Sequence, residues 1–119
     1  MEKGKIREAN PPALQQLFGP TAMAKLLDFL TLYHGLDYPK SEIAENSGIG
    51  WKTLHTLWPL LEHYELVKHT RDVGRAKLYR TNTDSPIIKA LHQLAYQIST
   101  HNLEKQAKKR APVPAIAKA

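Results

Sequence analysis

Six histidines are the side chains of this sequence best suited to bind a metal ion, because the chain contains no cysteine. No two of them are four residues apart, the spacing that places both rings on one helix face, and no carboxylate cluster accompanies them. We therefore expect no metal site among His34, His55, His63, His69, His92 and His101. The sequence also lacks a glycine-rich phosphate loop, a nucleophile elbow and a paired-carboxylate motif, so we expect neither catalysis nor a cofactor.

A second group of reactive side chains is basic and lies between residues 66 and 81. Residues 66–71 and 76–81 are rich in β-branched and aromatic side chains and flank a glycine-containing turn, which predicts a β-hairpin. Cations interrupt the apolar residues of this hairpin; they are Lys68, His69, Arg71, Arg75, Lys77 and Arg80. They could contact nucleic acid phosphates, or they could form a solvated face that protects a sheet edge from aggregation.

The helices that must position these cations follow from the spacing of apolar residues. We expect a largely apolar central helix between Thr21 and Gly35, and a short polar helix from Ser41 to Gly48. A third helix over residues 51–65 has an apolar inner face consisting of Leu54, Leu57, Trp58 and Leu61. Its remaining surface offers Trp51, Lys52, Thr53, His55, Thr56 and Pro59.

The last predicted helix spans residues 83–104, with Asp84 or Ser85 as its cap. Its apolar stripe could pack on its own domain or pair with the same helix of a second copy, giving a two-fold dimer. The stripe consists of Ile87, Ile88, Leu91, Leu94, Ala95 and Ile98. We expect residues 1–19 to be an N-terminal extension that could contain a short helix, residues 20–82 to be one domain, and residues 105–119 to be a basic disordered tail.

The order of three helices and a basic hairpin, with a tight glycine link between the second and third helices, resembles the winged helix-turn-helix transcription regulators. In particular, the sequence resembles the small archaeal regulators related to the ArsR and MarR groups. The resemblance rests on SEIAENSGIGWKTLHTLWPLLEHYELV and VGRAKLYR and covers residues 21–98. It implies a mainly α fold with a small β-hairpin wing and a C-terminal dimerisation helix.

The resemblance also implies a partner, double-stranded DNA, and the surface that contacts it. The helix that starts at Trp51 would enter the major groove, and the hairpin tip at Gly74 and Arg75 would follow the backbone or the minor groove. The expected DNA contacts are Trp51, Lys52, Thr53, His55, Thr56, Lys68, Arg71, Arg75 and Lys77. Trp51 could contact sugar, phosphate or a thymine methyl group, or it could simply cover the start of its helix.

Composition agrees with a polyanionic partner, because Lys and Arg number 17 against 11 Asp and Glu, a net charge of +6. The first ten residues carry no apolar segment typical of a secretory signal, and the longest apolar run is too short to span a bilayer. We expect a cytoplasmic, nucleoid-associated homodimer, with no small-molecule ligand that the sequence can predict. Two alternatives are a DNA architectural protein with weak sequence preference and a winged-helix module that binds another protein.

Overall fold

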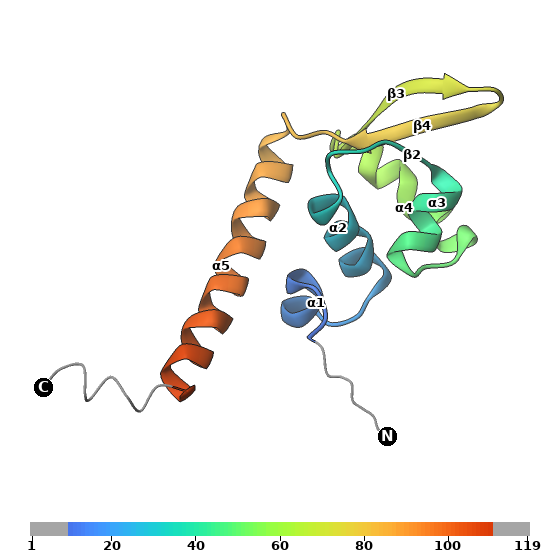
Figure 1. Cartoon of the computed structure of the whole chain (residues 1–119). Helices are drawn as coiled ribbons and strands as arrows, with labels where there is room; N and C mark the ends of the chain where they lie inside the picture. Colours follow the sequence, from blue (N-terminus) through green and yellow to red (C-terminus); the bar gives the residue numbers. More distant parts are fainter. Residues whose placement is uncertain (1–9, 111–119) are drawn as a thin grey trace, which may run out of the picture.

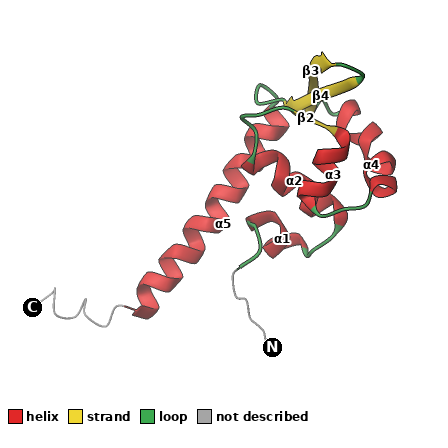
Figure 2. Cartoon of the chain, turned by 45° about the vertical axis from the view of Figure 1, so that its right-hand side comes forward, coloured by secondary structure: helices red, strands yellow, loops and turns green. Residues whose placement is uncertain are grey.

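The structure, a computed structural model, describes residues 10–110, with side chains as far as residue 108. It confirms the mainly α fold with a small β-hairpin wing (Figure 1). The elements follow in the order α1 Ala13–Phe18, α2 Ala22–Leu32, β2 Tyr38–Pro39, α3 Lys40–Ser47, α4 Trp51–His63, β3 Val67–Val73, β4 Ala76–Thr81 and α5 Pro86–Arg110. The hairpin projects beyond the helices at one end of the molecule, while α5 leads away from them toward the other end (Figures 1 and 2).

The core lies where α2, α3 and α4 meet the base of the hairpin. Leu26, Ile43, Leu54 and Leu61 are fully buried, as their helical spacing predicts. The Thr21 hydroxyl caps α2 by accepting a hydrogen bond from the backbone N–H of Ala24 (3.1 Å). Core packing fixes the inner face of α4 and leaves its other face exposed.

A tight link joins α3 to α4. Gly48 ends α3 in the left-handed conformation with φ 80°, and its N–H donates to the carbonyl oxygens of Ala44 and Glu45. The N–H of Ile49 also donates to the Ala44 carbonyl (3.0 Å). A side chain that carries a Cβ would be strained at Gly48, so this glycine sets the angle at which α4 leaves α3.

The sheet has three antiparallel strands in the order β2-β4-β3. Tyr38 and Pro39, for which the sequence analysis predicts no strand, form β2 and lie opposite Tyr79 and Leu78 of β4. A strand of two residues carries almost no periodic signal, so its pairing depends on tertiary context. The base of the hairpin is tied to the helices by the Thr81 hydroxyl, which donates to the Leu30 carbonyl (2.8 Å).

The segments on either side of residues 20–82 belong to the same packed body. In α1, Leu14 is fully buried, and the N–H groups of Leu14 and Gln15 each donate to the Asp28 carboxylate at 2.9 Å. In α5, Ile88 is fully buried in the core. Ser85 is the cap of α5, because its hydroxyl accepts from the N–H groups of Ile87 and Ile88.

The helix α5 continues to Arg110, which corrects the prediction that a disordered tail begins at residue 105. The stretch 105–110 lacks an apolar face, but its lysine, glutamine, alanine and arginine residues are strong helix formers and extend an existing helix readily. Residues 111–119 of the predicted tail and residues 1–9 of the predicted extension lie outside the described residues. Within residues 10–110, no helix combines the length and apolar character that crossing a membrane requires.

Candidate nucleic-acid interface

The exposed face of α4 carries the residues that the sequence assigned to it. Trp51, Lys52, Thr53, His55 and Thr56 are all exposed, whereas Leu54, Trp58 and Leu61 beneath them are buried. This face begins at the first turn of the helix, where the backbone N–H groups carry partial positive charge. The start of α4 is therefore the part of this face that most favours a negative charge.

Aromatic groups dominate the start of α4. Trp51 is 51% exposed, and its ring lies edge-on to the ring of His55 with 4.2 Å between centroids. The Thr56 hydroxyl donates to the backbone carbonyl of Lys52 (3.1 Å). Lys52 is thus the cation of this face, and the rest of the face consists of hydroxyl, imidazole and indole groups.

The hairpin tip, the second part of the interface, is polar and exposed. Gly74 has φ 62°, which permits the tight turn between β3 and β4, and Arg75 completes that turn. Lys77 follows on β4, and all three of these residues are exposed. The hairpin that carries Arg75 and Lys77 projects beyond the helices (Figure 1).

Cations nearer the base of the hairpin are engaged by acids. The guanidinium of Arg71 donates to Asp37 through Nε (3.1 Å) and Nη2 (3.3 Å), and the Thr70 hydroxyl donates to the same carboxylate (2.6 Å). These bonds, the one from Arg71 above all, lower the pKa of Asp37 to about 2. A bulge between His69 and Arg71 interrupts the β3–β4 register at this point, which lets the side chains of Thr70 and Arg71 reach the α2–β2 connection.

Two more basic residues of β3 have acidic neighbours. His69 Nε2 lies 2.6 Å from Asp72 Oδ1, and this hydrogen bond lowers the pKa of Asp72. Lys68 lies 3.9 Å from Asp84, a weak pair in solvent. The sequence placed Lys68 and Arg71 with the DNA contacts; the structure shows both beside carboxylates, which no spacing along the chain could reveal because Asp37 and Asp84 come from other segments.

A hollow of about 290 Å³ separates the start of α4 from the hairpin. We call it the α3–wing hollow; it is lined by Pro39, Lys40, Ser41, Trp51, Ala76, Lys77 and Tyr79. Lys40 was missed by sequence reasoning, because it stands outside both the third helix and the hairpin. Its Nζ lies 4.8 Å from the ring centroid of Trp58 and 5.6 Å from that of Tyr79.

The surface expected to form a dimer divides into buried and accessible residues. Ile88 lies in the core of its own chain, so it is removed from the predicted interface. Leu91 packs against the same core, Ile87 is 42% exposed, and Leu94, Ala95 and Ile98 are half-buried. The periodicity of α5 could not separate these roles, because one wide stripe serves both packing and exposure.

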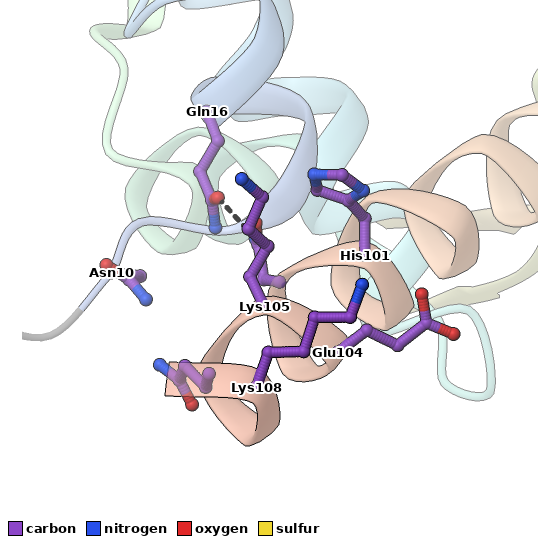
Figure 3. Close-up of a pocket in the computed structure, with 8 residues that line it drawn as sticks. Asn10, Gln16, His101, Glu104, Lys105 and Lys108 are labelled. Atoms are coloured by element: carbon purple, nitrogen blue, oxygen red, sulfur yellow. Dashed lines mark hydrogen bonds between the residues drawn. The ribbon is translucent and has the colours of Figure 1, made fainter. Parts of the chain in front are cut away.

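Several hollows border α1 and α5. One, of about 490 Å³, is lined by Gln16, Leu17, Leu94, Gln97, Ile98, His101 and Asn102. Another is more polar and lies near the end of α5, where the Asn102 amide donates to Gln16 Oε1 at 2.8 Å (Figure 3).

Among the histidines, His34 and His92 come together with ring centroids 4.9 Å apart. Across residues 10–110, no group of three histidine or carboxylate side chains is placed to hold a metal ion.

Comparison with solved structures shows which known proteins share this fold. The apo form of a mutant of Lactococcus lactis ZitR superposes with a TM-score of 0.55 at 19% sequence identity, covering 87% of this chain and 81% of that chain. MepR, a transcription regulator of the Staphylococcus aureus multidrug efflux pump MepA, gives a TM-score of 0.55 at 16% identity, covering 88% and 82%. Comparisons with protein-family models and with curated proteins find no match. The likeness therefore establishes the winged-helix fold of the chain.

Proposed function

We propose that the chain is a transcription regulator that binds double-stranded DNA as a homodimer and performs no catalysis. One observation carries the proposal: the exposed Trp51 at the start of α4 and the exposed Lys77 of the hairpin line a single hollow. In a winged-helix protein, these are the elements that can enter the major groove and follow the adjacent backbone. The structural similarity to MepR, a transcription regulator, supports the same interpretation.

Each part of the surface has a distinct chemical role in this proposal. Lys52, Arg75 and Lys77 neutralise phosphates and position the protein, while Thr53, His55 and Thr56 face the base edges. Trp51 packs against the sugar or a thymine methyl group beside the helix start. Arg71, which is bound to Asp37, holds the hairpin in place and contributes less to DNA affinity.

The proposed dimer forms along α1 and α5. Leu17 and Phe18 at the end of α1 are each 56% exposed, and Leu103 near the end of α5 is 65% exposed. Leu17, Leu94 and Ile98 line one hollow between the two helices, so these apolar side chains lie together. A two-fold pair would present two α4 helices to half-sites about one helical turn apart on the duplex, about 34 Å.

A protein-binding module remains a second candidate function because of one feature of α4. Trp51 and Leu60 are 51% and 45% exposed on this helix, and tryptophan is a frequent anchor of protein interfaces. A DNA architectural protein would use the same cations without base readout. The three functions differ in their selectivity for DNA sequence.

Selection of random duplexes by the purified full chain, followed by sequencing of the retained DNA, separates these functions. A dimeric regulator enriches a palindromic motif whose half-site spacing reports the dimer geometry. Retention without enrichment would favour the architectural function. No retention at low salt would contradict DNA binding and favour a protein partner.

A further inference from the structure

The α3–wing hollow contains two cations from different elements. Lys40 opens α3, and Lys77 lies on β4 on the other side of the hollow. The residues that line the hollow include no aspartate or glutamate. Two carboxylates lie near these lysines in the chain. Asp72 is opposite Lys77 in the strand register and is hydrogen-bonded to His69. Glu42 lies in the first turn of α3. The charged side chains that line the hollow itself are therefore both positive.

The position of Lys40 is fixed from beneath. Its ammonium group lies over the ring of Trp58, which is only 3% exposed and packs edge-on against Tyr79 with 4.9 Å between centroids. Because the ring faces attract the cation, Lys40 is held in one place rather than spread over the rotamers of a solvated lysine. A preordered cation loses less conformational entropy when an anion arrives.

We propose that the α3–wing hollow binds one backbone phosphate of the duplex, shared by Lys40 and Lys77. The inference rests on the proposed DNA-binding function and adds to it a residue, Lys40, that lies outside both the recognition helix and the hairpin. Trp51 lines the same hollow and belongs to the exposed face of α4. A phosphate held there fixes the depth and register at which α4 enters the groove, so Lys40 is a positioning residue for base readout.

The experiment measures the dissociation constant of the full chain for one fixed duplex at a series of salt concentrations. Loss of one phosphate contact lowers the slope of log K against log salt by about 0.9. Because the remaining lysine still pairs with the shared phosphate, Lys40→Gln and Lys77→Gln should each lower the slope by less than about 0.9. Lys40→Arg should keep it, and the exposed Lys89→Gln on α5 is the matched control that should leave it unchanged.

The double variant tests whether the phosphate is shared. If both lysines neutralise one phosphate, Lys40→Gln/Lys77→Gln should lower the slope by about 0.9 in total, whereas separate phosphates would give about 1.8. The proposal is overturned by the larger value, or by a double variant whose slope equals that of Lys77→Gln alone. A wild-type chain that binds no duplex at low salt would overturn the proposed function with it. Wild-type binding in which Lys40→Gln adds nothing to the effect of Lys77→Gln would overturn only the shared phosphate site.

Discussion

The two parts of the proposed DNA interface, the outer face of α4 and the hairpin wing, differ in what holds them and in what they present. The face of α4 rests on a fully buried core and presents mostly aromatic and hydroxyl groups. The wing presents cations, and its base is held by polar contacts such as the Arg71–Asp37 pair. The charge of the wing is therefore of two kinds: cations near its base pair with acids, whereas cations at its tip are exposed.

The largest expected effect comes from the support beneath α4. Leu54→Ala removes a fully buried side chain and should lower the free energy of unfolding by about 2–5 kcal/mol, measured by urea denaturation. DNA binding should fall in parallel, because α4 loses its fixed position. Thr53→Ala, one residue away and exposed, is the control and should change stability by less than about 0.5 kcal/mol. Equal losses for the two variants would contradict a core-supported α4.

The next effect distinguishes the tip of the wing from its base. Arg75→Gln should weaken binding to all duplexes alike and lower the salt slope by about 0.9, because it removes a phosphate contact. Arg71→Gln should lower the slope by less, because Arg71 is already paired with Asp37. Titrations of both variants against one duplex check this ordering. A larger slope change for Arg71→Gln would show that the cations at the base also contact DNA.

The stability that the contact between Asp37 and Arg71 contributes should depend on pH. The pKa of Asp37 is lowered to about 2 in the folded protein, below about 3.9 in an unfolded chain. Its contribution to stability is therefore present above about pH 4 and is lost as pH falls toward 2. Asp37→Asn should be less stable than wild type at neutral pH, and the gap should narrow in acid. A gap that stays constant between neutral pH and pH of about 2 would contradict the role of the Asp37 carboxylate.

The smallest expected effect concerns the aromatic start of α4. Trp51→Ala should reduce affinity for a preferred duplex while leaving the salt slope unchanged, because an indole ring neutralises no phosphate. The fold should survive the change, since Trp51 is half exposed while Trp58 is buried. Binding titrations with Trp51→Ala and the conservative Trp51→Phe measure the effect. A change in slope would contradict a neutral packing role for this side chain.

The sequence predicted the fold because its signals were local. Apolar spacing gave α2 and α4, the glycine at position 48 gave the tight link, and β-branched runs around a glycine turn gave the hairpin. The limits of α5 were harder to predict, because helix-forming residues without an apolar face can either extend a helix or remain disordered. The short strand β2 depends on pairing with β4 and so has no signal of its own.

The candidate site was less predictable than the fold. Exposure of Trp51, Lys52 and Arg75 follows from helix periodicity and from the turn, so the sequence could place them. The pairing of Arg71 with Asp37 and the placement of Lys40 over Trp58 join residues far apart in the chain. Such contacts depend on the tertiary fold, and a count of positive residues cannot distinguish a cation that binds DNA from one that holds the wing.

The central claim is that DNA binds to the face shared by the start of α4 and the wing tip. The most direct test is nuclear magnetic resonance of the labelled full chain, with backbone amide shifts followed while duplex DNA is added. We expect the largest changes at residues 51–56, at 74–77 and at Lys40, with small changes in the Leu17 and Leu103 region. Changes concentrated along α1 and α5, or none at low salt, would contradict the claim.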